Sequence, residues 1–179
     1  MAAPVRVVVL ADTHVRTTSG DGRHRGRPIP EAVWKALAGA DAILHAGDLL
    51  DAGVLRLLRQ HAPVHAVLGN NDLSLGGILP STMVVDIAGV RIGIIHDSGA
   101  RAGRAARMRR RFPDADVVVF GHSHAPLDEE GLFGQRLFNP GSPTQRRAQP
   151  VCSYGELRLA VGSVVDHRII PLDGSSQPG

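Results

Sequence analysis

The chain has 179 residues, of which 43% are hydrophobic and 21% charged, and its formal net charge is +3. This composition is typical of a globular protein, and no segment reaches the roughly 20 apolar residues that a membrane-spanning helix needs. The N-terminus lacks the features of a signal peptide, and the lone Cys152 excludes an internal disulfide, so we expect a cytoplasmic protein without membrane association.

Strands and helices alternate over the first two thirds of the chain. Apolar runs predict strands at residues 5–11, 42–46, 64–68, 83–87, 90–95 and 117–120. Amphipathic or capped segments predict helices at residues 31–37, 51–60 and 101–112. A polar segment over residues 15–30 is too long for a simple connection and indicates a substrate-facing or mobile loop.

The pattern changes after residue 120. Residues 132–138, 151–159 and 164–170 show the alternation of strands, with no helix between them. Strand–helix units followed by a run of strands predict an α/β fold of four layers, with two packed sheets and helices outside. We expect one domain over residues 1–173 and a disordered tail over residues 174–179.

Five short polar clusters, each directly after an apolar run, are the most informative feature of the sequence. They are Asp12-Thr13-His14, Gly47-Asp48, Gly69-Asn70-Asn71-Asp72, His96 and Gly121-His122-Ser123-His124. Ligands of open α/β sheets collect outside the carboxyl ends of the strands, so these clusters are expected to converge on one site. Each cluster alone is a weak signal, since a Gly-Asp pair is a common turn; their joint occurrence favours a functional site.

The clusters contain the donor types that divalent metals bind. The candidate ligands are Asp12, His14, Asp48, Asn70, His96, His122 and His124. Carboxylate, amide and imidazole donors without a thiolate suit Mn, Fe, Ni, Co or Zn. This number of donors exceeds the needs of one ion and fits two divalent ions that share a carboxylate. We therefore predict a dinuclear centre, with Mn²⁺ as the preferred metal.

In this order the motifs resemble those of the calcineurin-like metallophosphoesterase superfamily. The small size and the sequence Asn139-Pro-Gly-Ser142 are similar to its single-domain bacterial and archaeal phosphodiesterases, and the resemblance covers residues 5–143. It implies a sandwich of two mixed β-sheets flanked by helices. The implied ligand sets are Asp12, His14, Asp48 and His124 for one ion, and Asp48, Asn70, His96 and His122 for the other.

The resemblance also implies the reaction. A small phosphate ester, most simply a diester, would be hydrolysed by in-line attack of a hydroxide that bridges the metals, with Asp48, Asn70 and His122 acting through them. One departure is Asn71, which stands where larger family members have a histidine that protonates the leaving group; an amide cannot act as an acid. A second departure is Asp97, where the family has glycine, and it either accepts a hydrogen bond near the site or crowds it.

Five further residues are candidates for supporting roles. His45 lies close to Asp48 in sequence and either supports the site or is an ordinary buried histidine. Asp72 is expected to orient His14 or a neighbouring loop. Arg16 and Arg146 are candidate phosphate clamps, although an ordinary surface arginine is the alternative that we favour. Asp97 completes this group.

Two other functions remain open. A eukaryotic retromer subunit uses this fold as an interaction scaffold, so the chain could be a weakly catalytic metal-binding scaffold; that subunit has lost metal-site residues that this chain retains. A nuclease could use the six arginines of residues 101–111, but aromatic residues make up only 3% of the chain, and a solvated helix face is the simpler interpretation. Self-association into a homo-oligomer is compatible with each of these functions.

Overall fold

The structure is a computed structural model that describes residues 3–17, 24–25 and 27–172. Its helices are α1 (Glu31–Leu37), α2 (Ala52–Arg59) and α3 (Arg104–Arg111), with 3₁₀ turns η1 (Leu73–Leu75) and η2 (Leu132–Gly134). Its strands in the first half are β1 (Val5–Leu10), β2 (Arg16–Thr17), β3 (His24–Arg25), β4 (Ala42–His45), β5 (Val64–Ala66), β6 (Thr82–Ile87) and β7 (Val90–Ile95). Those of the second half are β8 (Val117–Val119), β9 (Leu127–Glu130), β10 (Arg136–Asn139), β11 (Cys152–Ala160) and β12 (Ser163–Leu172).

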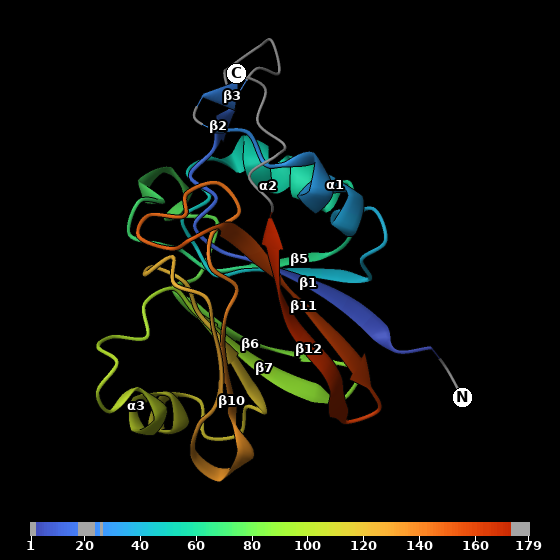
Figure 1. Cartoon of the computed structure of the whole chain (residues 1–179), viewed down its shortest axis with the longest axis vertical. Helices are drawn as coiled ribbons and strands as arrows, with labels where there is room; N and C mark the ends of the chain where they lie inside the picture. The colour runs from blue at the N-terminus through green and yellow to red at the C-terminus, as the bar shows by residue number, and fades with distance from the viewer. Residues whose placement is uncertain (1–2, 18–23, 26, 173–179) are drawn as a thin grey trace.

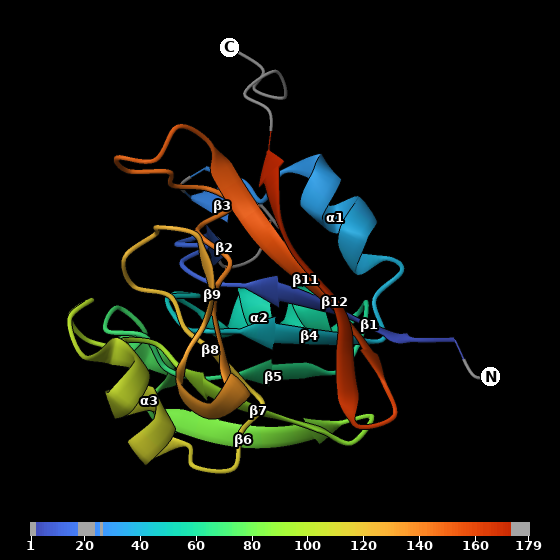
Figure 2. The same cartoon turned by 60° about the horizontal axis from the view of Figure 1, so that its bottom comes forward.

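Two five-stranded sheets form the centre of the molecule (Figures 1 and 2). The first has the order β12-β11-β1-β4-β5, with β1, β4 and β5 parallel, β11 antiparallel to β1, and β12 antiparallel to β11. The second has the order β6-β7-β8-β10-β9, with β7, β8 and β10 parallel between antiparallel edge strands. Both sheets are therefore mixed, as the resemblance implied.

Alternate residues of β1 show how the layers form. Val7 and Val9 point into a core between the two sheets, whereas Val8 and Leu10 pack against α1 and α2 on the outer face. On the far side, Met108 and Phe112 cover the second sheet from the end of α3. Figure 1 shows α1 and α2 on one side of the sheets and α3 on the other. The predicted four-layer αββα sandwich is confirmed.

Local chemistry explains where α2 begins. The Asp51 carboxylate accepts hydrogen bonds from the backbone N–H groups of Gly53 and Val54, which otherwise lack partners at a helix N-terminus. Val54, Leu55 and Leu58 then form the buried face against the first sheet. The helix predicted over residues 51–60 is confirmed, with Asp51 and Gln60 as its caps.

Some predicted boundaries were wrong. The third helix begins at Arg104 instead of residue 101, because Gly103 adopts a left-handed conformation with φ of 70°. The strand predicted over residues 132–138 begins only at Arg136, since Phe133 has φ of 56° within a 3₁₀ turn. Strand β9 was missed because its sequence, Leu127-Asp-Glu-Glu130, is mostly charged.

The loop predicted over residues 15–30 contains a short antiparallel pair, β2 and β3, in its described part. The disordered tail predicted over residues 174–179 lies outside the described residues. Among the described residues, no helix is long and apolar enough to cross a membrane.

Candidate metal centre

The candidate donors come from both sheets and meet where their parallel strands end. Asp12 and His14 follow β1, Asp48 follows β4 and Asn70 follows β5, all in the first sheet. His96 follows β7, and His122 and His124 follow β8, in the second sheet. The carboxyl ends of parallel strands lie at one edge, so the sandwich brings all of these side chains to a common seam.

Three donors form a first group on one side of this seam. The Nε2 atoms of His14 and His124 lie 3.2 Å apart, and the His124 Nε2 atom lies 3.5 Å from Oδ1 of Asp12. One ligand atom from each of these residues falls within 4.8 Å of the others, a spacing that can hold one ion.

Three further donors form a second group. The amide oxygen of Asn70 lies 3.0 Å from Nε2 of His96 and 3.0 Å from Nδ1 of His122. The two imidazole nitrogens are themselves 3.3 Å apart. These atoms are therefore arranged around one point that a second ion could occupy.

The Asp48 carboxylate lies between the two groups. Its Oδ2 atom is 3.5 Å from Nε2 of His14 and 3.6 Å from Nε2 of His96. Asn71 holds this carboxylate through two hydrogen bonds, from its backbone N–H to Oδ1 at 2.9 Å and from its side-chain amide to Oδ2 at 2.8 Å. Burial alone would raise the pKa of Asp48, but the two Asn71 hydrogen bonds together with the nearby His96 and His14 lower it, which favours the ionised carboxylate.

The environment of Asp12 supports a cation at this position. Both of its carboxylate oxygens are buried, and neither has a hydrogen-bond partner among the described residues. Burial, followed by the negative charge of Asp48, raises the pKa of Asp12 to about 8. A buried carboxylate without partners is costly, and a divalent ion between it and Asp48 would remove that cost.

Two of the histidines are oriented by backbone carbonyls. The Nδ1 atom of His96 lies 2.7 Å from the carbonyl oxygen of Ala46, and that of His124 lies 2.6 Å from that of Gln145. With Nδ1–H donating to the carbonyl, the lone pair of Nε2 is directed at the seam. Burial lowers the pKa of His124 to about 4, which keeps its imidazole neutral, as a metal ligand must be.

The backbone is strained at the donors. Five of them have positive φ angles: Asp12 (53°), His14 (47°), Asp48 (60°), His122 (68°) and His124 (56°). This conformation is uncommon for residues other than glycine, and such strain gathers at functional sites because the surrounding structure holds it in place. The backbone strain is an observation separate from the distances between the side chains. Both observations indicate that these residues form a functional site.

A glycine provides the space for Asp48. A Cβ atom on Gly69 would collide with the backbone nitrogen and carboxylate of Asp48. The glycine of the third polar cluster therefore has a packing role, because it allows the β5 loop to approach the β4 loop closely.

A family model described as the calcineurin-like phosphoesterase superfamily domain matches residues 5–160. The chain belongs to this superfamily. A probable metallophosphoesterase of Methanothermobacter thermautotrophicus is 38% identical over 141 residues, which cover 78% of this chain and 77% of the relative. A second probable metallophosphoesterase, from Methanocaldococcus jannaschii, is 31% identical over 169 residues, which cover 92% of this chain and 80% of the relative.

A solved structure has a similar fold and includes a metal ion. Vps29 of Entamoeba histolytica, in complex with Zn²⁺, superposes with a TM-score of 0.69 at 28% identity, covering 93% of this chain and 99% of that one. Calcineurin-like phosphoesterases bind divalent metals, and this chain has the candidate ligand groups described above.

The predicted supporting residues lie in different places in this calcineurin-like domain. Asp72 is buried and accepts hydrogen bonds from three backbone N–H groups, those of Asp48 (2.8 Å), Leu50 (2.7 Å) and Gly69 (2.8 Å). It therefore holds the neighbouring loops together, one of the two roles expected for it. His45 is fully buried with its Nε2 atom 3.2 Å from the Thr13 hydroxyl, and burial lowers its pKa to about 3.

The other supporting candidates make no hydrogen bond to the donor side chains among the described residues. Asp97 is exposed and accepts a hydrogen bond from the Gly99 N–H, so it shapes a turn, and no described residue of the donor groups contacts its carboxylate. Arg16 is exposed at the start of β2. Arg146 lines a pocket beside the first donor group.

The role of the loop after β10 was largely missed by sequence reasoning. In this loop, Ser142 donates to the carbonyl oxygen of Asp12 and Thr144 to that of Thr13, at 2.7 and 2.6 Å. Gln145 orients His124 through its carbonyl, and Arg147 donates to the carbonyl oxygen of His122 at 3.1 Å. The signal available in the sequence was Ser142 of the Asn-Pro-Gly-Ser segment, which points to a structured turn but not to its partners.

Proposed function

We propose that the protein is a dinuclear metal-dependent phosphodiesterase that hydrolyses a small phosphate ester. The observation that carries this proposal is the position of Asp48. One oxygen of its carboxylate lies 3.5 and 3.6 Å from donors of two separate groups, which is the arrangement that a shared ligand of two ions requires.

The residues divide by the ion they would hold. Asp12, His14 and His124 would bind one ion, Asn70, His96 and His122 the other, and Asp48 both. Bound divalent ions lower the pKa of water and neutralise the charge of a phosphate group, with Mn²⁺ the ion we expect for this donor set. The chain's own contribution is to lower the pKa of His14 and His124 through burial, which favours neutral imidazoles. It also orients His96 through Ala46 and His124 through Gln145, and it holds the Asp48 carboxylate through Asn71.

An interaction scaffold is the second candidate function, and the similarity to Vps29 is the observation in its favour. Against it stands the complete donor set, since a scaffold has no need of a buried carboxylate without partners or of five strained donor residues. Catalysis is therefore the function that the site supports best.

The arginines of α3 give little support to a nuclease. Arg107 donates to the carbonyl oxygens of Ser98 and Ala102, and Arg111 donates to the Thr82 hydroxyl. Arg104 lies over the ring of Phe120, with 5.1 Å between the guanidinium carbon and the ring centroid. Several of these cations thus stabilise the fold, which leaves fewer of them for nucleic-acid phosphates.

Hydrolysis of bis-p-nitrophenyl phosphate tests the proposal. The purified protein is freed of metal, reloaded with Mn²⁺ and compared with the Asp48→Ala and His122→Ala variants. The exposed His61, which packs on Trp34, provides a matched histidine control as His61→Ala. We expect both site variants to lose at least about a hundredfold in kcat/KM and the control to keep its activity. Absence of turnover with every divalent metal would overturn the enzymatic function, and full activity of both site variants would overturn this assignment of the site.

A further inference from the structure

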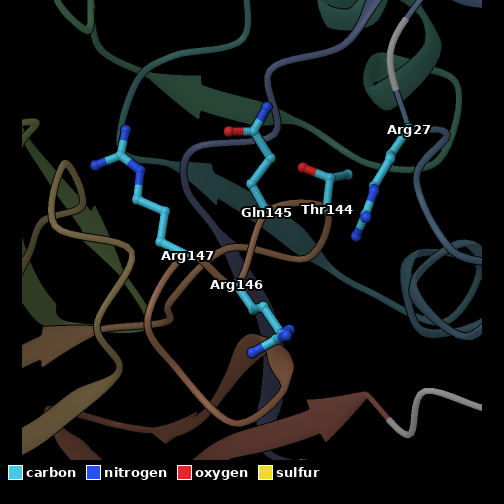
Figure 3. A pocket seen from close by; sticks show the side chains of 5 residues that line it. All are labelled: Arg27, Thr144, Gln145, Arg146 and Arg147. Carbon is cyan, nitrogen blue, oxygen red and sulfur yellow. The ribbon is translucent and has the colours of Figure 1, made fainter.

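A pocket of about 410 Å³ lies beside the first donor group, and its lining is strongly basic (Figure 3). It is lined by Arg27, Thr144, Gln145, Arg146 and Arg147. Its volume is within the range of about 300–1,000 Å³ that is typical of ligand sites. The described lining residues include three arginines and no carboxylate, so the pocket is suited to an anion.

Within the described part of the chain, the arginines of this pocket have no carboxylate partner. Among the described residues, none of Arg27, Arg146 and Arg147 forms an ion pair with a carboxylate. The two loop arginines donate to backbone carbonyls, Arg146 to that of Gln149 and Arg147 to that of His122. Three such guanidinium groups around one pocket repel one another, and a bound anion would offset this repulsion.

The pocket has a fixed position relative to the proposed metal ligands. Gln145 lines it and also bonds His124, and Thr144 lines it and bonds the backbone of Thr13, between Asp12 and His14. Arg147 lines it and bonds the backbone of His122. The same short loop therefore forms one wall of the pocket and supports ligands of both ions.

The arginines reach the pocket from different positions. Figure 3 shows Arg147 and Arg146 extending from the loop in different directions, with Arg27 on a separate segment. Arg147 is bonded to the donor segment, so it is near a phosphate held at the metals. Among the described residues, Arg27 and Arg146 make no hydrogen bond to the donor segments, so we assign them to the outer part of the pocket, away from the metals, where a group linked to that phosphate would lie.

We propose that the substrate is a phosphate ester that carries a second phosphate, and that Arg27 and Arg146 bind this second phosphate in the outer pocket. Guanidinium groups form paired hydrogen bonds with phosphate oxygens, which gives them both strength and orientation. A simple diester has one phosphate, which would bind at the metals. Such a substrate would leave these arginines without a ligand. The proposal rests on the proposed function, because the scissile phosphate is taken to lie at the metal centre.

Two esters that differ in a single phosphate test the inference. They are the p-nitrophenyl ester of thymidine 5′-phosphate, and the same ester with an additional 3′-phosphate. We expect the second ester to have a KM at least about tenfold lower with the Mn²⁺-loaded protein. In the Arg27→Ala/Arg146→Ala variant, the two KM values should approach each other.

The control variant is Arg59→Ala/Arg110→Ala, which removes the same net charge. Both control arginines are exposed near the C-terminal ends of α2 and α3, whereas the N-termini of these helices follow the strand ends of the site. This variant should keep the preference for the second phosphate. An equal loss of preference in the control would indicate a general effect of net charge and would overturn the assignment to Arg27 and Arg146.

Equilibrium binding separates this inference from the proposed function. Titration calorimetry compares thymidine 3′,5′-bisphosphate with thymidine 5′-phosphate, which need not be hydrolysed. A preference of at least about tenfold for the bisphosphate, lost in Arg27→Ala/Arg146→Ala, supports the pocket even if no ester is hydrolysed, and in that case only the proposed function fails. Equal affinities in the unmodified protein overturn the second-phosphate pocket whether or not the esters are hydrolysed.

Discussion

The carboxylate of Asp72 accepts a hydrogen bond from the backbone N–H of Asp48 at 2.8 Å. The same oxygen accepts the N–H of Gly69, and the other oxygen accepts that of Leu50. One buried side chain thus joins the loops that follow β4 and β5. The position of the proposed shared ligand therefore depends on a residue that does not face the metal centre.

Replacement of Asp72 by Asn should weaken both the fold and the metal site. An amide group would direct N–H at one of the backbone N–H donors and leave it without an acceptor, at a cost of about 1–3 kcal/mol. We expect this loss in chemical denaturation of the metal-free protein, together with a fall of about 10–100-fold in Mn²⁺ affinity by calorimetry. An affinity within twofold of the original would show that Asp72 does not position Asp48.

Gly69→Ala should displace Asp48 directly, since the added Cβ would overlap its backbone and carboxylate. Gly77→Ala is the matched control, because a Cβ atom there meets no other atom within 4 Å. We expect Gly69→Ala to lose Mn²⁺ binding and to be destabilised by about 1–3 kcal/mol, and Gly77→Ala to retain both properties. Normal metal binding by Gly69→Ala would mean that the two loops can separate at little cost.

The positive φ of His122 predicts an unusual order of stabilities. His122→Ala and His122→Gly both remove the imidazole, so both should lose metal binding, but glycine accepts φ of 68° without strain. The glycine variant should be more stable than the alanine variant by about 1 kcal/mol in thermal or chemical unfolding. At Arg110, in the last turn of α3, the order should be reversed. The same order at both positions would argue against backbone strain at His122.

The absence of an acid at Asn71 predicts a strong dependence on the leaving group. Asn71 donates its amide to Asp48, and an amide does not protonate a departing oxygen. Phenyl esters should therefore react at least about tenfold more slowly than p-nitrophenyl esters, and Asn71→His should reduce this ratio where Asn71→Ala does not. Equal kcat/KM values for the two esters would show that another group supplies the proton.

A buried ion pair distant from the site predicts a stability that depends on pH. Burial alone would raise the pKa of Glu156, but Arg6, bonded to it at 2.7 and 2.9 Å, and Arg158, bonded to it at 3.2 Å, together lower it. The stabilisation is therefore complete above the usual pKa of 4.5 and is lost as the pH falls through the lower value of the folded state.

Glu156→Gln tests this ion pair. The variant should be less stable by about 1–3 kcal/mol at pH 7, and its difference from the unmodified protein should shrink below about pH 4. Glu31→Gln is the control, because Glu31 pairs with Lys35 on the surface and should contribute less than about 0.5 kcal/mol. A difference that does not change between pH 7 and pH 3 would contradict the assigned pKa shift.

The sequence predicted the layers and the meeting of the donors because both follow from general rules. Strand ends such as those before Asp12 and Asp48 are recognised from their apolar runs, and parallel strands place such ends at one edge. The basic pocket could not be predicted in this way. Arg27 and Arg147 are 120 positions apart, and their proximity depends on loops whose path follows from individual hydrogen bonds.

The interpretation of Asn71 shows a second limit. The sequence indicated only that an acid was missing, whereas the structure shows a donor to both oxygens of Asp48. A motif shows which residue type is absent. The partner of the side chain that replaces it, here Asn71, depends on the rotamer of that side chain and on its surroundings. Arg146 was noted as a candidate, but its role depends on Arg27, which the sequence did not single out.

The division of the donors between the two sheets has a consequence for the rate at which the protein is degraded in a cell. Asp12, His14, Asp48 and Asn70 belong to one half of the sandwich, and His96, His122 and His124 to the other. Ions bound among them would join the halves at an edge where the metal-free protein has a buried carboxylate without partners. Metal supply and protein turnover would then be coupled, with metal-starved molecules the first to be opened by proteases.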